Sequence, residues 1–222
     1  MAKPKIKLYV DVVSPFAYFA FYALENFPVF KQCEISYVPV FLGGIMKACN
    51  NTAPIQIKNK DKWINTERLR WARAFSIPVL ATSPPGFPPN TVAAQRALTA
   101  LQLAHPAALP AALAAMYDAF WVRGEPITDA AVIGRAVASA LGGDAGAAAA
   151  VVERSAAKEV KELLVARTGE AVEVDGAFGM PWFVATNAKG ETECFWGFDH
   201  LGQVTDHLGL ERPTAGGWKA ML

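Results

Sequence analysis

Near the N-terminus, alternating apolar and polar residues predict a strand that leads into a helix. Residues 5–10 favour β structure, and an aromatic run follows Ser14-Pro15. Serine is a favoured helix cap and proline suits the first helical position, so we expect a helix that begins there and ends before Pro28. Residues 34–41 are rich in Ile, Tyr and Val. They predict a second strand, parallel to the first through a βαβ crossover.

The middle of the chain has a helical composition. Residues 91–167 are rich in Ala and Leu, and scattered prolines and a Gly pair interrupt them. This pattern predicts several short helices rather than one long helix. Residues 81–89 contain four prolines and one glycine, so we expect a rigid loop there.

The β pattern returns after residues 168–169. Residues 182–185 and 193–196 are apolar and aromatic, and the turn-forming residues 187–190 lie between them. We therefore predict a β-hairpin. Asp199 then opens a short final helix.

This order of elements indicates an α/β protein with a thioredoxin-like fold and an all-helical insertion domain. We expect residues 1–48 and 169–222 to form the first and second parts of the thioredoxin-like domain. Residues 49–168 would form the helical insertion. The two parts must then meet in space, which brings distant segments to one end of the sheet.

Composition narrows the class of partner. The 222 residues carry 21 Lys plus Arg and 20 Asp plus Glu, so a net charge of +1 provides no field that attracts nucleic acid. No apolar run approaches the roughly 18 residues that cross a bilayer. The N-terminal residues also lack a secretory pattern. We expect a soluble intracellular protein with no nucleic-acid and no membrane partner.

The spacing of cysteine and histidine argues against disulfides and metal sites. The cysteines lie far apart without a Cys-x-x-Cys pair, and the histidines lack the spacing of metal ligands. These residues are Cys33, Cys49, Cys194, His105, His200 and His207. We expect reduced thiols and no metal.

Ser14 is the first candidate for chemistry. In thioredoxin-type redox enzymes this turn carries Cys-x-x-Cys, and the helix N-terminus stabilises the leading thiolate. Here Ser14 and Ala17 occupy the two cysteine positions, which excludes dithiol exchange at this site. The remaining hydroxyl and free backbone N–H groups suit an anionic sulfur that a ligand brings in.

Two further segments should reach the same end of the sheet. A proline that enters a strand at this place in the fold, here Pro181, is typically cis, and it leaves the N–H and C=O of Met180 free to pair with an extended peptide. Glutathione is such a peptide. Residues 196–200 turn into the last helix, where N–H groups can bind a carboxylate and Asp199 an ammonium group.

Five segments, in this order and at similar spacing, resemble the kappa-class glutathione transferases and the related 2-hydroxychromene-2-carboxylate isomerases. They are residues 9–16, 44–47, 77–78, 176–181 and 195–199. The resemblance covers nearly the whole chain. It implies a fold of the DsbA-like superfamily and glutathione as co-substrate.

The resemblance also implies the role of each residue in the first half of the site. Ser14 would be the catalytic residue, because it would hydrogen-bond the glutathione sulfur, and Pro15 and Phe16 would lie beside that sulfur. Asn51 would contact the tripeptide. Lys60 would lie near the glycyl carboxylate.

The second half of the site follows in the same way. Met180, with Pro181, would pair with the cysteinyl amide and carbonyl of glutathione. Phe198 and Asp199 would bind the γ-glutamyl end. The family usually has Ser where this chain has Phe198, so a hydroxyl contact is lost there and the γ-glutamyl site departs from the family pattern.

Several of these residues have a purely structural alternative. Ser14 and Asp199 suit helix caps on their own. Lys60 lies in a run of charges that is often simply solvated. The arginines of residues 68–73, around Trp71, indicate a solvated helix face with a buried indole.

The sequence therefore predicts a glutathione transferase that conjugates the thiolate to small hydrophobic electrophiles, or reduces peroxides with it. Phe16, Trp182 and Trp196 would hold the electrophile. One alternative is a glutathione-dependent isomerase of the 2-hydroxychromene-2-carboxylate type. An alternative of another class is a redox-inactive thioredoxin-fold binding module without affinity for glutathione.

The resemblance further implies a homodimer, and the Ala-rich helices offer flat surfaces with few charges. Relatives of the kappa class occur in mitochondria and peroxisomes. The C-terminal Ala220-Met221-Leu222 resembles a peroxisomal tripeptide but lacks its basic middle residue. Mitochondrion, peroxisome and cytoplasm all stay open.

Overall fold

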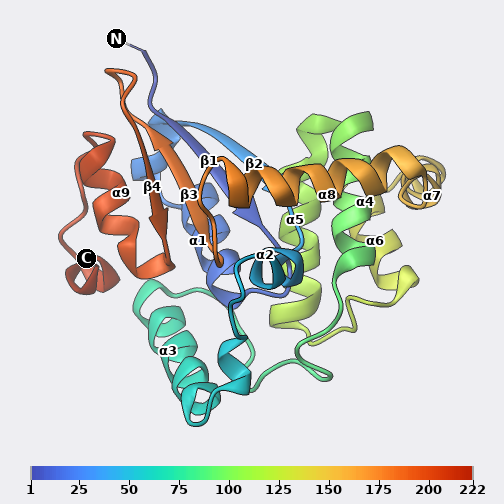
Figure 1. The fold of residues 1–222 in the computed structure, drawn as a ribbon, viewed down its shortest axis with the longest axis horizontal. Coiled ribbons are helices and arrows are strands. Elements are labelled where there is room, and N and C mark those ends of the chain that lie inside the picture. The colour runs from blue at the N-terminus through green and yellow to red at the C-terminus, as the bar shows by residue number, and fades with distance from the viewer. Residues whose placement is uncertain (1, 222) are drawn as a thin grey trace.

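The sheet of this computed structural model, which describes residues 2–221, has the strand order β2-β1-β3-β4 (Figure 1). β1 (Lys5–Val10) pairs in parallel with β2 (Glu34–Pro39). It pairs antiparallel with β3 (Trp182–Thr186), and β3 pairs antiparallel with β4 (Thr192–Trp196). The predicted βαβ unit and hairpin are both confirmed. Leu222, the last residue of the C-terminal tripeptide, lies outside the described residues.

The two faces of the sheet have separate cores, because successive side chains of a strand point to opposite faces. Leu8 and Val10 of β1 belong to the large core, together with Phe19 of α1 (Pro15–Asn26). Tyr9 belongs to a smaller core with Ile45 of α2 (Leu42–Ala48) and with Ala171 of α8 (Lys158–Glu173). Figure 1 shows α1 behind the sheet and α8 in front of it.

The helical block follows β2 in the chain. α3 (Lys60–Phe75) lies at the lower left of Figure 1, apart from the other helices of the block. The predicted short helices are α4 (Val92–Ala104), α5 (Leu109–Tyr117), α6 (Ala130–Ala140), α7 (Ala145–Arg154) and α8 (Lys158–Glu173). Residues 81–89 form no helix or strand, so the predicted loop is confirmed.

The end of α8 differs from the expectation. The helix runs through Thr168 and Gly169 to Glu173, although the sequence predicts a return of β structure after residue 169. The Thr168 hydroxyl donates to Leu164 O at 2.7 Å, and its oxygen accepts from Phe41 N at 3.1 Å. Thr168 therefore fastens the helix to the segment that leads into α2.

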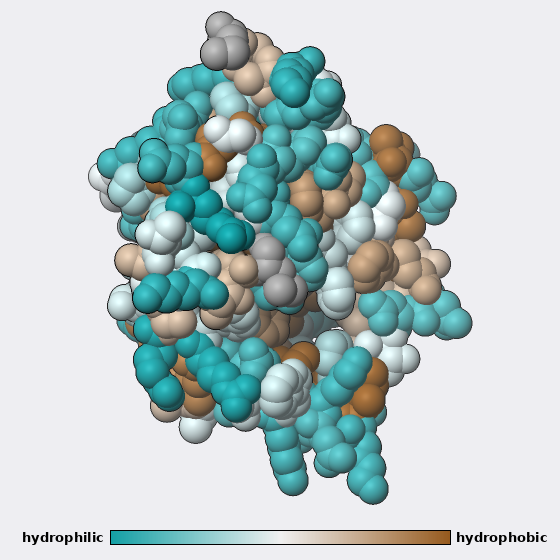
Figure 2. All heavy atoms as spheres, turned by 90° about the vertical axis from the view of Figure 1, so that its left-hand side faces the viewer, coloured by the Kyte–Doolittle hydropathy of each residue, from teal (hydrophilic) through white to brown (hydrophobic). Residues whose placement is uncertain are grey.

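The last predicted helix begins later than expected. Phe198–His200 form a 3₁₀ turn, and α9 (Leu201–His207) follows it. Within residues 2–221, no helix is long and apolar enough to cross a membrane. The face shown in Figure 2 is largely hydrophilic, with hydrophobic side chains scattered over it and gathered in a hollow in its lower half.

Candidate functional site

A cavity of about 480 Å³ lies where the three predicted segments meet. Ser14, Met180 and Trp196, one from each segment, all line it. A volume of this size is typical of a small-molecule site. The predicted meeting of the two halves of the chain at one end of the sheet is therefore confirmed.

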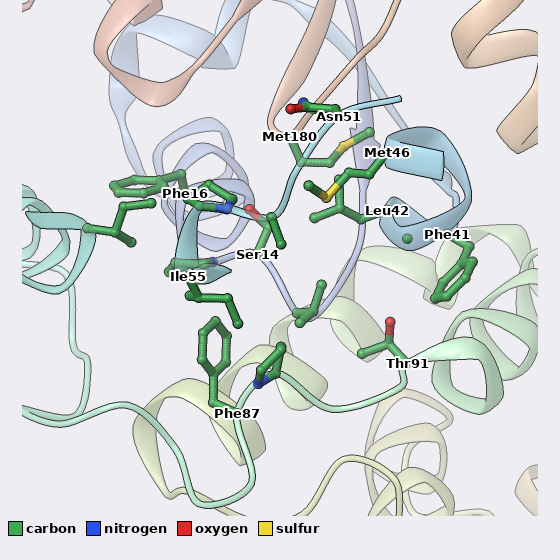
Figure 3. A pocket seen from close by; sticks show the side chains of 18 of the residues that line it. Ser14, Phe16, Phe41, Leu42, Met46, Asn51, Ile55, Phe87, Thr91 and Met180 are labelled. Carbon is green, nitrogen blue, oxygen red and sulfur yellow. The ribbon is translucent and has the colours of Figure 1, made fainter. Parts of the chain in front are cut away.

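The cavity has apolar walls around Ser14. Figure 3 shows Ser14 between Phe16 and Ile55 on one side and Leu42 and Met46 on the other. The polar side chains that line the cavity include those of Ser14, Asn51, Asn90 and Thr91. No charged side chain of residues 2–221 lines it. Apolar walls bind water poorly. A hydrogen bond to an anion is therefore stronger in this cavity than in water.

Ser14 caps α1 and still has a hydrogen to offer. Its Oγ accepts from Ala17 N at 3.1 Å, and its C=O accepts from Tyr18 N at 3.0 Å. The predicted cap is confirmed. The hydroxyl hydrogen has no acceptor among the described residues, and a hydroxyl can donate while it accepts. Pro15 has no N–H, and the N–H groups of Ala17 and Tyr18 are paired with Ser14. The Phe16 N–H is therefore the second free donor of this turn, beside the Ser14 hydroxyl.

Asp11 lies fully buried beneath this turn and was missed as a functional candidate. Its carboxylate accepts from Leu42 N at 2.8 Å, Gln95 Nε2 at 3.0 Å and Val13 N at 3.1 Å, and its C=O accepts from Ser14 N. It therefore connects the turn before α1 to the start of α2. Burial raises the pKa of Asp11, while these N–H donors oppose the rise.

The backbone of Met180 is available to a ligand. The Met180–Pro181 peptide is cis, as the sequence predicts. Neither the N–H nor the C=O of Met180 has a hydrogen-bond partner among the described residues. The next turn lies alongside, since Gly197 N donates to Pro181 O at 3.1 Å.

The loop that carries Met180 is tied down at three places. Ala177 N donates to Ala171 O of α8 at 2.7 Å. Asn51 Nδ2 donates to Phe178 O at 2.9 Å. Asp175 accepts from Lys7 Nζ and from the Tyr9 hydroxyl of β1, each at 2.6 Å. Met180 is therefore held against the sheet, and Asn51 has a structural bond in addition to any contact with a ligand.

Some predicted site residues lie outside the cavity lining. Pro15, Phe16 and Asn51 line it, whereas Lys60, Pro181, Phe198 and Asp199 do not. Lys60 is the exposed first residue of α3. The Phe198 ring packs in the core, 5.7 Å from the Phe19 ring and 5.3 Å from the Phe75 ring. Only its backbone can reach a ligand.

Two expectations about side chains at this end are wrong. Asp199 caps no helix, because Gly197 precedes the 3₁₀ turn with φ +97° and His200 precedes α9, neither with a capping side chain. The Asp199 carboxylate instead lies 3.4 Å from His200 Nδ1. Trp182 does not line the cavity, because it is buried in the smaller core of the sheet. Trp196 does line it, as predicted.

The expected solvated arginine face of α3 is also wrong in part. Arg73 is exposed, and Arg70 is exposed beside Glu67. Arg68, however, is only 2% exposed. Its guanidinium donates to the carbonyl of Leu80, so the helix is pinned to the proline-rich loop.

That proline-rich loop forms part of the site, although the sequence indicated only its rigidity. Phe87 and Asn90 line the cavity, and the Phe87 ring lies 5.4 Å from the Trp121 ring. Thr91, before α4, lines it as well. In the sequence, the only indication that this loop belongs to the site was a rigid, partly apolar segment before a helix. It carries no spacing that indicates which side chain faces a ligand.

The comparisons with known proteins agree with this geometry. A family model described as the DsbA-like thioredoxin domain matches residues 5–209. The chain is 28% identical over 219 residues to glutathione S-transferase kappa 1 of Caenorhabditis elegans, covering 95% of this chain and 93% of the relative. It is 29% identical over 213 residues to human glutathione S-transferase kappa 1, with 92% and 90% covered. The resemblance to the kappa class is confirmed.

Solved structures share the fold. A 2-hydroxychromene-2-carboxylate isomerase superposes with a TM-score of 0.74 at 22% identity, covering 92% of this chain and 94% of that one. The cytosolic disulfide reductase DsbM of Pseudomonas aeruginosa, solved with GSH, has a TM-score of 0.59 at 15% identity, covering 92% and 96%. The thioredoxin-like fold with helical insertion is thereby confirmed.

Proposed function

Since the chain belongs to the DsbA-like thioredoxin-domain family, we propose that it binds glutathione in the cavity at Ser14 and activates its thiol for transfer to an electrophile. One observation carries this proposal. Ser14 combines an unused hydroxyl hydrogen with a helix N-terminus inside an apolar cavity. An anionic sulfur is the reacting group that such a site stabilises.

The activation rests on two donors. The Ser14 hydroxyl and the Phe16 N–H both lie at the start of α1, and a thiolate accepts hydrogen bonds more strongly than a thiol does. Both donors therefore lower the thiol pKa from its ordinary value of about 8.5. Each pH unit of this lowering corresponds to about 1.4 kcal/mol. The thiolate then attacks the electrophile, which the apolar walls hold.

The tripeptide backbone has a matching partner in Met180. Its unpaired N–H and C=O lie on a well-anchored loop, and they can pair with the cysteinyl amide and carbonyl of an extended peptide. Asn51 lines the same cavity and keeps a free side-chain oxygen. Glutathione binding is also what the names of the kappa-class relatives suggest.

The two charged ends of glutathione are placed by the resemblance alone. Lys60 would receive the glycyl carboxylate, and the Phe198 backbone with Asp199 would receive the γ-glutamyl group. These residues do not line the cavity, so the ligand ends would extend beyond it. Mutation of each residue tests its role separately.

A second candidate reaction is a glutathione-dependent isomerisation. The superposition on a 2-hydroxychromene-2-carboxylate isomerase favours it, and both reactions use the same activated sulfur. Product analysis separates them, because a transferase or a peroxidase consumes glutathione while an isomerase returns it. Candidate electrophiles, peroxides and hydroxychromene carboxylates would be tested in parallel.

The test of the binding step is thermal unfolding with and without millimolar glutathione. Binding to the native state raises the midpoint in proportion to the logarithm of ligand over dissociation constant. We expect a rise with glutathione and with S-methylglutathione. No rise with either would favour a redox-inactive binding module instead.

A further inference from the structure

A second cavity of about 260 Å³ lies beside the first one. Pro15, Ile55, Ile64 and Phe87 line both cavities. Figure 3 shows Ile55 and Phe87 on the side of Ser14 away from Met180 and Met46. A molecule that reacts at Ser14 can therefore extend past these shared residues, on the side opposite to the Met180 backbone.

The smaller cavity holds the charge that the main cavity lacks. Arg68 and Asp61 line it, and Trp121 forms part of its wall. Asp61 is exposed to solvent, whereas Arg68 is only 2% exposed. The Arg68 guanidinium lies over the Trp121 ring, 5.6 Å from its centre. The smaller cavity therefore has one buried cation, Arg68, beside the aromatic ring of Trp121.

Within residues 2–221, Arg68 forms no salt bridge with a carboxylate, and Asp61 of the same cavity makes none with it. Arg68 Nη1 donates to Leu80 O at 2.6 Å, and its Nη2 donates to Asn65 Oδ1 at 2.7 Å and, more weakly, to Ala81 O at 3.4 Å. All three acceptors are neutral. A guanidinium has five N–H donors, so two are left without one of these bonds.

The three neutral acceptors offset the charge of the buried Arg68 only in part. Removing a charge from water costs several kcal/mol unless an opposite charge compensates it. The pKa of Arg68 is accordingly lowered by its burial. A purely structural clamp to Leu80 and Ala81 does not require that charge, whereas recognition of an anion does.

We propose that Arg68 binds the carboxylate of the second substrate, an aromatic or aliphatic acid whose apolar body lies against Phe87 and Trp121. This inference rests on the proposed function, because the acid is the partner of the glutathione thiolate at Ser14. It narrows the substrate class from apolar electrophiles in general to those that carry a carboxylate. The forked guanidinium suits two parallel bonds to that group.

The test uses naphthoate and naphthamide, which share one apolar body and differ in charge. Their affinities are measured by isothermal titration calorimetry on the wild-type protein. We expect naphthoate to bind about tenfold or more tightly than naphthamide, as a charge-assisted bond implies. Equal affinities would overturn the proposal.

Variants locate the effect. Arg68→Gln removes the charge and keeps a polar amide, so the preference for naphthoate should vanish. Arg73→Gln, on the exposed part of the same helix, should keep it. Persistence of the preference in folded Arg68→Gln would refute the assignment. If Arg68→Gln does not fold, Asp61→Asn provides the test. Removing this carboxylate should strengthen the binding of naphthoate but not that of naphthamide. Unchanged binding of naphthoate would refute the assignment.

Glutathione itself carries carboxylates, so its binding needs a separate measurement. S-Methylglutathione should bind Arg68→Gln within about twofold of the wild type, since Arg68 contributes no bond to it. Weaker S-methylglutathione binding with an unchanged naphthoate preference would assign Arg68 to glutathione and overturn the proposal. If the wild type does not bind S-methylglutathione, the proposed function is wrong. The comparison of naphthoate with naphthamide still tests whether Arg68 binds a carboxylate.

Discussion

Asp11 links the turn before Ser14 to the start of α2 with a carboxylate that is buried without a cation partner among the described residues. Because burial raises the pKa of Asp11, the native carboxyl keeps its proton at a pH where the unfolded chain has lost it. The unfolded value is about 4. Above that pH the native state binds more protons, so its stability falls as the pH rises towards the native pKa.

Asp11→Asn removes this titration, and we therefore predict a particular pH trend. The advantage of the wild type in unfolding free energy should be largest at and below about pH 4, and it should shrink as the pH rises towards the native pKa of Asp11. Urea unfolding of both proteins across this range measures the difference. A difference that grows with pH would mean that the N–H donors outweigh burial and that Asp11 is ionised.

Asp199 gives the second prediction at the scale of a residue. Since its side chain caps no helix, Asp199→Ala should cost less than the roughly 1 kcal/mol of a lost cap. If Asp199 binds the ammonium of glutathione, affinity should still fall. Calorimetric titration with glutathione measures the affinity, and unfolding in urea measures the change in stability. Unchanged affinity would remove Asp199 from the site.

The residues that sequence reasoning found differ from those it missed in one respect. Ser14 and Met180 stand in motifs whose spacing carries meaning, at a helix start and before a proline. Asp11 and Arg68 owe their importance to burial, which depends on residues far away in sequence. Gln95 lies 84 positions from Asp11, and no local pattern indicates that contact.

Among the elements, the loop of residues 174–181 matters most for the proposed binding of the tripeptide. Asp175 anchors it to β1 through Lys7 and Tyr9. The Tyr9 side chain is itself buried in the smaller core of the sheet. The anchor therefore couples the position of Met180 to the interior of the protein.

We predict that Asp175→Ala weakens glutathione binding, although Asp175 lies outside the cavity lining. Loss of bonds to a charged group should also lower the unfolding free energy by about 1.5–3 kcal/mol. Glu170→Gln is a matched control, because Glu170 lies 3.6 Å from the same Lys7 but is half exposed, and such pairs contribute about 0–1 kcal/mol. Equal glutathione affinity in both variants would refute the coupling.

Elements with a strong local signal were predictable, and elements ended by tertiary contacts were not. β1 and the hairpin follow from alternation and turn residues. The true end of α8 did not follow, because Gly169 is a poor helix former and only the bonds of Thr168 to Leu164 and Phe41 show how the helix is fastened there. The late start of α9 did not follow either, because Phe198–His200 form a 3₁₀ turn before it.

At the scale of the whole molecule, we predict a homodimer. The kappa-class resemblance supports it, and exposed apolar side chains such as Val165 and Val174, 71% and 74% exposed on and just after α8, offer surface that a partner can cover. Light scattering at micromolar concentration should give twice the mass of one chain. The mass of a single chain would contradict this prediction.

The central claim is that Ser14 activates the thiol of bound glutathione. Ser14→Ala removes one charge-assisted bond of about 1.5–3 kcal/mol and leaves the helix N-terminus and the Phe16 N–H in place. Asp144→Ala is the matched control, because Asp144 caps α7, away from the cavity lining. It should lose stability without any effect on the thiol.

The most direct test is the ultraviolet absorbance of the thiolate in the glutathione complex, followed across pH. In the wild type and in Asp144→Ala, the midpoint should lie below the ordinary thiol value of about 8.5. In Ser14→Ala it should lie about one to two pH units higher than in the wild type. A wild-type midpoint at the ordinary value, or the same midpoint in Ser14→Ala, would contradict the account.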